Sequence, residues 1–267
     1  GKNKYSTSPA EFSAWLSQLN RAASILGASS ERYKPKTSEV DSLRNLQRGV
    51  FAKRRIQVGE TIGHADLYLA FPPSEGQVTA NDIGKYVLIT ALRNFDPDQP
   101  LQNDAVQITN NRSAIQNIAR RVSQLVKEAR VTFPEFADLE ISHHYGVEKF
   151  YEHGLTMITV VNREYCKKIL ILLPGQAHPE QYHKKKEETF HVLWGSGQIR
   201  LDGKEQEMKP GDVFVIQPET RHYFSSEVGV VLEEISSTHY PDDSFYTDEA
   251  IQQNKNRKTF LTHWSMV

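Results

Sequence analysis

The chain has 267 residues, 38% of them hydrophobic and 24% charged, which is the balance of a globular protein with room for two domains. Its 32 basic residues nearly cancel its 33 acidic ones, and a net charge of −1 argues against nucleic acid or an anionic membrane as the partner. The single cysteine, Cys166, excludes an intrachain disulfide. The apolar runs are too short to cross a bilayer, and no signal peptide is evident, so we expect a cytoplasmic protein.

Residues 1–45 are predicted to hold one amphipathic helix and a linker. The helix spans 8–26, with Ser8 as its cap and Glu11 completing a capping box. The polar stretch 28–41 is predicted to be the linker.

Residues 46–108 are predicted to form a small β-rich domain. The β-rich runs 49–52 and 86–91 alternate with turn signals. Short helical turns are expected at 64–66 and 80–82.

A linking helix and a β-barrel are predicted for most of the remaining chain. The helix covers 112–130 within a linking segment, 109–131, and shows one apolar stripe with Asn111 as its candidate cap. The domain 132–240 holds evenly spaced short strands without intervening helices, a pattern typical of a closed or jelly-roll barrel. The expected strands are 155–161, 168–173, 189–194, 199–201, 212–216 and 229–235. Residues 241–267 are predicted to be a polar tail with a helix at 247–254.

Four side chains are candidate metal ligands. Gln181 and His183 stand two apart, so on a strand they share one face. Glu188 follows after a lysine-rich bend, and His222 adds a further imidazole. Imidazole and carboxylate together suit a divalent transition metal such as zinc, manganese, iron or nickel.

Lys186 and the pair Glu233–Glu234 are candidates for acid–base chemistry. A desolvated lysine can hydrogen-bond sugar hydroxyls or move a proton, although three lysines in a row more often form a solvated bend. Strand alternation sends one of the two glutamates inward, where Glu234 could serve an aldose–ketose isomerase or be a buried structural acid. His178, predicted in a loop, and His191, of open orientation, are weaker ligand candidates.

The spacing of these residues resembles the cupin superfamily. Its first motif places a glycine, a His-x-His pair, a glutamate and a second glycine at intervals that this chain reproduces with Gly175, Gln181, His183, Glu188 and Gly195. Gln181 stands where the first histidine belongs. The second motif, a glycine with a histidine eleven positions later, matches Gly211 and His222. Because an amide oxygen binds divalent metals more weakly than imidazole, a three-ligand site, a glutamine-assisted site and a metal-free sugar pocket all stay open.

The front half resembles a SAF, or antifreeze-like, domain. Residues 48–62 hold its opening arginine, small residue, two apolar residues and Gly-Glu turn, and 82–86 are similar to its later Gly-Lys step. Such domains follow the catalytic barrel in sialic acid (N-acetylneuraminate) synthases, and residues 1–45 are similar to the last barrel helix and linker of those enzymes. The resemblance implies that Arg48 contacts the sugar in the active site of another subunit. It also implies a homodimer whose (β/α)8 synthase barrel lies outside this sequence.

The expected fold class is mainly β, with a small SAF (β-clip) domain before a cupin double-stranded β-helix and with N-terminal and linking helices. The leading function is the SAF–cupin portion of an N-acetylneuraminate synthase-like protein of nonulosonic acid or surface polysaccharide biosynthesis, its cupin binding a sugar and a divalent metal. One alternative is a metal-dependent sugar isomerase or epimerase similar to lyxose-isomerase-like cupins. Another is a non-catalytic dimerisation module, since one fold hosts many functions.

Overall fold

The structure is a computed structural model that describes residues 6–27, 34–134, 136–254, 256–262 and 264. It divides into two compact units. The first comprises Gly1–Ile83 and Ala91–Val106, and the second comprises Gly84–Thr90 and Gln107–Val267. No helix in these described ranges is long and apolar enough to span a membrane.

The elements up to residue 110 are two α-helices, two 3-10 turns and five short strands. They are α1 (Pro9–Leu26), α2 (Thr37–Asn45), β1 (Gly49–Ala52), β2 (Thr61–Ile62), η1 (His64–Asp66), β3 (Leu67–Ala70), β4 (Val87–Ala91), η2 (Asn103–Ala105) and β5 (Val106–Asn110). Strand β1 pairs with β3, and β4 lies between β2 and β5 in a three-stranded sheet.

The N-terminal helix has the predicted cap. The Ser8 hydroxyl accepts a hydrogen bond from the Glu11 N–H at 3.3 Å, and the Glu11 carboxylate accepts one from the Ser8 N–H at 2.8 Å. The predicted linker 28–41 is wrong from Thr37 onward, because α2 begins there. Its start is fixed by the Glu39 carboxylate, which accepts from the Lys36 N–H at 3.0 Å. Residues 28–33 lie outside the described part.

Two smaller expectations differ from the structure. Residues 64–66 form the 3-10 turn η1 as predicted, whereas 80–82 form only a hydrogen-bonded turn, closed by the Asp82 N–H on the Thr79 carbonyl at 3.0 Å. Asn111 takes the N-cap position of the linking helix, but its side chain makes no capping bond.

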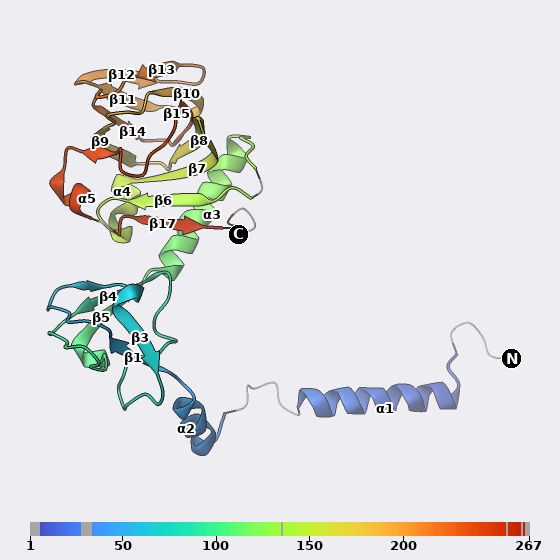
Figure 1. Ribbon diagram of the computed structural model, residues 1–267. Coiled ribbons are helices and arrows are strands. Elements are labelled where there is room, and N and C mark those ends of the chain that lie inside the picture. The colour runs from blue at the N-terminus through green and yellow to red at the C-terminus, as the bar shows by residue number, and fades with distance from the viewer. Residues whose placement is uncertain (1–5, 28–33, 135, 255, 263, 265–267) are drawn as a thin grey trace. The chain divides into compact units, whose positions relative to one another are not determined.

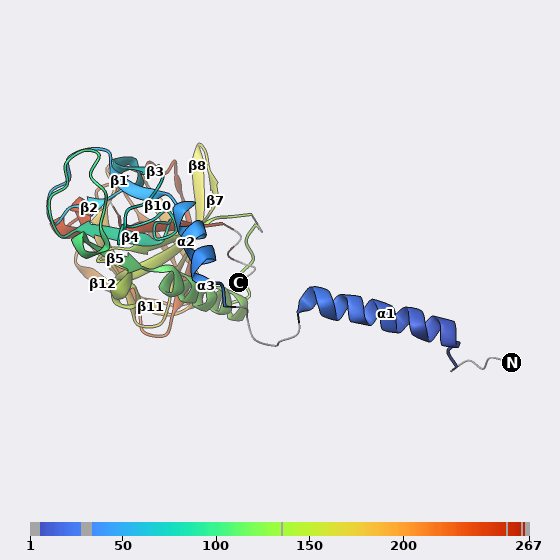
Figure 2. The same cartoon turned by 90° about the horizontal axis from the view of Figure 1, so that it is seen from below.

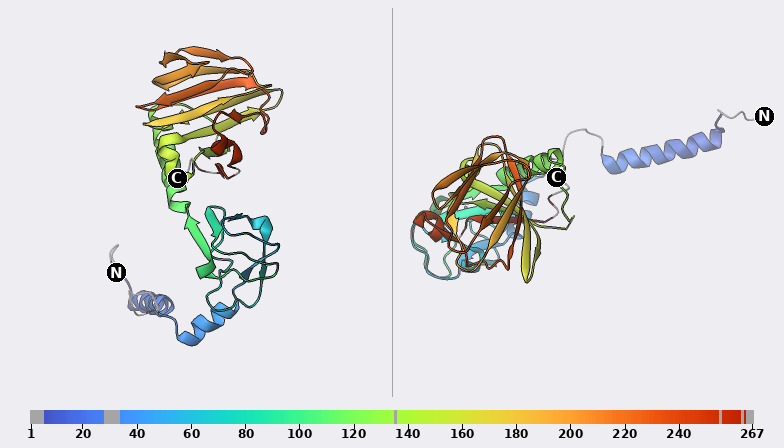
Figure 3. Two further views of the ribbon diagram at one scale, coloured as in Figure 1. Left: turned by 90° about the vertical axis from the view of Figure 1, so that its left-hand side faces the viewer. Right: turned by 90° about the horizontal axis from the view of Figure 1, so that it is seen from above.

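The second unit is built from two sheets and the linking helix α3. Its elements are α3 (Arg112–Glu128), β6 (Leu139–His143), η3 (Val147–Lys149), α4 (Phe150–His153), β7 (Gly154–Asn162), β8 (Tyr165–Leu172), β9 (Gln176–Tyr182), β10 (Glu188–Gly195), β11 (Gly197–Leu201), β12 (Lys204–Met208), β13 (Val213–Ile216), β14 (His222–Ser226), β15 (Val230–Ser237), β16 (Phe245–Tyr246), α5 (Glu249–Gln253) and β17 (Lys258–Leu261). One sheet has the order β13-β10-β15-β8-β7-β6-β17 and the other β12-β11-β14-β9-β16. The antiparallel β7–β8 hairpin is visible in Figure 2 and the stacked strands in Figure 3. This arrangement confirms the mainly β class.

The part of the seven-stranded sheet around β6 and the second half of β8 is buried on both faces, which explains why Ile169–Leu172 form a continuous apolar run. Ile169 and Ile171 pack with the stripe of α3, which lies along β6, β7 and β8 in Figure 1. Leu170 and Leu172 alternate to the opposite face and meet Phe190 and other side chains of the barrel core. The polar side chains on the inner face of this sheet are therefore carried by strands whose outer face packs against α3.

The polar C-terminal segment contains two strands, β16 and β17, that the sequence pattern did not predict. The helix expected at 247–254 is present as α5, but β16 pairs with β9 and β17 pairs with β6. Both are short strands at the edges of their sheets, and neither is long enough to show a clear apolar alternation. Through these pairings, residues after 240 reach the cavity of the barrel.

Candidate metal centre and barrel cavity

The three principal ligand candidates come together inside the barrel. His183 follows β9 directly, Glu188 begins β10 and His222 begins β14. Their ligand atoms lie within 4.8 Å of one another, and all three residues are at most 3% exposed. Gln181 pairs with His222 across β9 and β14, so it stands beside the group.

Glu188 stands between the two imidazoles. Its Oε1 lies 3.4 Å from His183 Nε2, and its Oε2 lies 3.4 Å from His222 Nε2. Glu188 Oε2 and His183 Nε2 are buried, and neither has a hydrogen-bond partner among the described residues. Buried polar atoms without a partner are rare and need an explanation, and a cation between them would supply one.

Backbone carbonyls orient both histidine rings. His183 Nδ1 donates to the Asp243 carbonyl at 2.5 Å, and His222 Nδ1 donates to the Thr220 carbonyl at 3.1 Å. With the proton on Nδ1, each Nε2 presents its lone pair to the group, as in metal-binding histidines. Burial lowers the pKa of His222, which keeps this ring neutral and able to act as a ligand.

Gln181 fits an assisting role. Its Nε2 lies 3.2 Å from His222 Nε2, while its Oε1 is buried without a partner in the described structure. A half-turn of the amide would exchange the two atoms and direct the oxygen to where the amide nitrogen now lies. The donor set of two imidazoles, one carboxylate and one amide oxygen therefore fits a divalent transition metal.

Lys186 and Glu234 form an ion pair beside these ligands. Lys186 Nζ lies 2.5 Å from Glu188 Oε1 and 2.7 Å from Glu234 Oε1. Burial opposes the charge on Lys186, but Glu188 and Glu234 outweigh it and raise the pKa of the lysine. Burial likewise opposes the charge on Glu188, yet Lys186 and the histidines keep the pKa of that carboxyl well below its usual range. Ser236 Oγ donates to Glu234 Oε1 at 2.9 Å and fixes its orientation.

Asp243 holds the loop that carries Lys186. Its carboxylate accepts the backbone N–H groups of Lys184, Lys185 and Lys186 at 3.0–3.3 Å, while its own carbonyl orients His183. The spacing of the ligand candidates did not connect Asp243 with this site, because Asp243 lies 60 positions from His183 along the chain.

Asp243→Ala is expected to destabilise the protein by roughly 2–4 kcal/mol, because three backbone N–H groups, that of Lys186 buried and the other two partly buried, lose their charged acceptor. It should also weaken metal binding about tenfold, since His183 loses part of its support. Urea unfolding of the chelator-treated protein and manganese titration measure the two effects. Asp242→Ala, at the exposed neighbouring position, is the matched control. Equal stability of Asp243→Ala and the control would contradict this role.

The structure places the other candidates away from the ligand group. Glu233 points outward to Lys167, with 2.7 Å between Oε1 and Nζ, and His191 lies beside it on that face. The prediction that His178 lies in a loop is wrong, because the residue lies within β9. Its ring stacks on that of Phe224, with 4.8 Å between the ring centroids. The pairing of β9 with β14 shifts register between His178 and Gln181, where Pro179 lies. His178 is not part of the ligand group.

Arg48 belongs to the first unit. Its guanidinium lies 5.9 Å from the centroid of the Phe71 ring. The sugar contact expected of this arginine stays a prediction.

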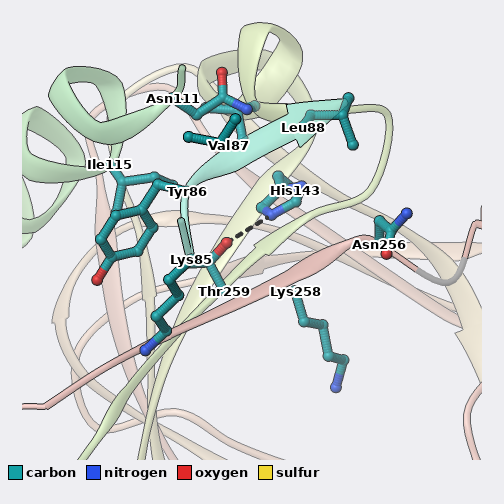
Figure 4. A pocket seen from close by; sticks show the side chains of 11 residues that line it. Lys85, Tyr86, Val87, Leu88, Asn111, Ile115, His143, Asn256, Lys258 and Thr259 are labelled. Atoms are coloured by element: carbon teal, nitrogen blue, oxygen red, sulfur yellow. Dashed lines mark hydrogen bonds between the residues drawn. The ribbon is translucent and has the colours of Figure 1, made fainter. Parts of the chain in front are cut away.

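A cavity opens against the ligand group and the Lys186–Glu234 pair. It is lined by Lys168, His178, His239, Tyr246 and Lys258 together with apolar side chains of both sheets. Its free volume is about 30 Å³, room for about two water molecules. A separate pocket in the same unit is lined by Lys85–Leu88, Asn111 and His143 and contains a 3.0 Å bond between His143 and Thr259 (Figure 4). No ligand group of the kind above lines it among the described residues.

Comparison with known families matches the part of the chain that carries this site. The family model described as "Cupin domain" matches residues 168–233, which include all four candidate ligands. The mainly β fold with a cupin domain, predicted from sequence, is thereby confirmed.

Among individual proteins, the chain is 27% identical over 173 residues to the D-lyxose/D-mannose isomerase of Thermosediminibacter oceani, covering 53% of this chain and 95% of that protein. It is 27% identical over 172 residues to the D-lyxose ketol-isomerase of Thermofilum sp., covering 49% and 95%. A solved structure of spore coat polysaccharide biosynthesis protein E from Chromobacterium violaceum is 39% identical, with a TM-score of 0.30. That match covers 40% of this chain and only 32% of the other.

Proposed function

We propose that the chain is a metal-dependent aldose–ketose isomerase that interconverts a sugar aldehyde and its ketose. The observation that carries the proposal is the buried His183–Glu188–His222 group with unpartnered ligand atoms, next to the Lys186–Glu234 pair. Similarity to two ketol-isomerases over 95% of their length supports it. The isomerase alternative is thus favoured over the synthase function that the sequence suggested first.

In this proposal His183, Glu188, His222 and Gln181 hold the cation, which when bound acts as a Lewis acid on neighbouring oxygens of the sugar. Glu234 takes the proton from C2 of the open-chain aldose and returns it to C1, while the proton on O2 passes to O1, so that the C1 carbonyl becomes a hydroxyl and the C2 hydroxyl becomes a carbonyl. Lys186 binds the sugar and hydrogen-bonds O1 as charge develops there. The pair suits this division, because Ser236 and Lys186 fix the carboxylate while Lys186 stays protonated.

The test is an isomerisation assay on the chelator-treated chain before and after addition of zinc, manganese, iron or nickel. Deuterium uptake at C2 of D-lyxose and D-mannose from heavy water would support enolisation at this site. A sugar needs more room than the cavity offers, so we expect the Tyr246 side chain, which lines the cavity, to move on binding. No turnover of any aldose with any of these metals would refute the proposal.

A second candidate rests on the SAF-like segment 48–62. In this reading the chain is the SAF–cupin portion of an N-acetylneuraminate synthase-like protein, and Arg48 contacts the sugar of the condensation reaction. The antiparallel β1–β3 pair beginning at Gly49 is compatible with it. Condensation of phosphoenolpyruvate with an N-acetylated amino sugar by the full-length gene product, and its loss in Arg48→Ala, would support this reading. Light scattering would test whether the chain is a homodimer. It would also test the remaining alternative, in which the cupin domain is a non-catalytic dimerisation module.

A further inference from the structure

Lys168 is a buried residue of the barrel cavity whose ammonium has no ion-pair partner among the described residues. It is 3% exposed and lines the cavity beside Glu234, its opposite neighbour across β8 and β15. Within the described part of the chain, no carboxylate oxygen lies within 4.0 Å of its ammonium, and the ammonium donates no hydrogen bond. Removing an ammonium from water costs free energy that only a nearby anion offsets.

The other two lysines of the cavity are compensated. Lys186 contacts both Glu188 and Glu234, and Lys258 Nζ lies 2.7 Å from Glu140 Oε1. Every carboxylate that lines the cavity is therefore already engaged by a cation, and a divalent ion on the ligand group would add further positive charge. Lys168 remains as a positive centre facing the space that a ligand would fill.

His239 lies in the positive electrostatic field of the same lysines. It lines the cavity, and its Nδ1 is buried without a partner among the described residues. Burial, and then the charges of Lys168, Lys186 and Lys258, lower the pKa of His239 to about 3. The ring is therefore neutral near pH 7 and offers an uncharged hydrogen-bonding group next to Lys168.

We propose that Lys168 binds an anionic group on the sugar, so that the substrate is an aldose carrying a carboxylate or a phosphate rather than a neutral aldose. The isomerisation itself rests on the proposed function, whereas the anion site rests on Lys168. An anion here would pair with the ammonium inside the barrel, away from bulk water, where a charge-assisted hydrogen bond is strong. A neutral aldose would leave the ammonium unpaired.

The test compares three unreactive analogues by calorimetry on the manganese-loaded chain: mannitol, mannonate and mannitol 6-phosphate. We expect at least one anionic analogue to bind about tenfold or more tightly than mannitol. Lys168→Gln should bring that ratio close to one, and Lys168→Arg should keep most of it. Lys167→Gln, whose side chain points outward to Glu233, is the matched control and should keep the wild-type ratio.

The outcomes separate this proposal from the isomerase proposal. Equal binding of the three analogues, no binding of the anionic ones, or a ratio unchanged in Lys168→Gln would overturn the anion site. Anion binding that depends on Lys168, without turnover of mannose, mannuronate or mannose 6-phosphate, would refute the isomerase and leave the anion site standing. Tighter binding of mannonate would identify a sugar acid, and tighter binding of mannitol 6-phosphate a sugar phosphate.

Discussion

Replacing either His183 or His222 by alanine is expected to abolish retention of a divalent metal. Each ring supplies an Nε2 that its Nδ1 bond holds toward Glu188. Loss of an outer support costs such sites roughly 10–100-fold in affinity, so loss of a ligand should cost more. Plasma mass spectrometry after manganese loading and gel filtration measures the retained metal.

Lys184→Ala is the control for both variants, because that ammonium lies over the Phe245 ring, 4.6 Å from its centroid, and belongs to the exposed part of the bend. Gln181→His should act in the opposite direction and tighten binding, since imidazole is a stronger ligand than an amide oxygen. Wild-type metal content in both histidine variants would eliminate the site.

The second large effect is expected from Glu234→Gln. The substitution keeps the shape of the side chain but removes the carboxylate that would move the proton, so kcat should fall by about 10²–10⁴-fold. Metal content should stay at the wild-type level, because Glu234 contacts Lys186 and Ser236 rather than the ligand atoms of the group. Initial rates of isomerisation and deuterium exchange at C2 would measure the loss.

Glu233→Gln is the matched control, one residue away on the outer face of β15, where the side chain pairs with Lys167. Its rate should remain within a few-fold of wild type. A Glu234→Gln protein as active as this control would show that Glu234 is a structural acid. Lys186 would then be the remaining candidate for acid–base chemistry.

Local sequence signals fixed much of the framework. The capping box at Ser8 predicted where α1 starts, and the apolar period predicted α3. The motif glycines Gly175, Gly195 and Gly211 all have positive φ, of 83°, 78° and 94°, a conformation that glycine adopts without strain. Gly195 also leaves no room for a Cβ, which would stand 2.1 Å from the Gly229 carbonyl. The caps, the apolar period and the positive-φ turns depend on near neighbours in the chain, which a sequence displays directly, whereas the close approach of Gly195 to Gly229 depends on strand pairing.

The site residues were predicted in part from local sequence spacing and in part depend on the tertiary structure. Motif spacing selected His183, Glu188 and His222, and strand alternation predicted that one of Glu233 and Glu234 would face inward. Which of the two faces inward depends on how β15 pairs with β10, where Glu234 lies opposite Phe190. That register is a property of the sheet and not of either strand alone.

By itself, the sequence determined the mainly β class, the two long helices and the ligand types with their spacing, because periodicity, caps and turn residues act over a few positions. Only the tertiary structure decided that Lys186 is buried between two carboxylates, that Lys168 has no such partner in the described chain, and that Asp243 supports the metal-site loop. Apart from the contact of Lys186 with Glu188, these facts depend on residues about 50 to 70 positions apart in the chain. The burial and pairing of a charge are set by the distant side chains that the fold brings against it.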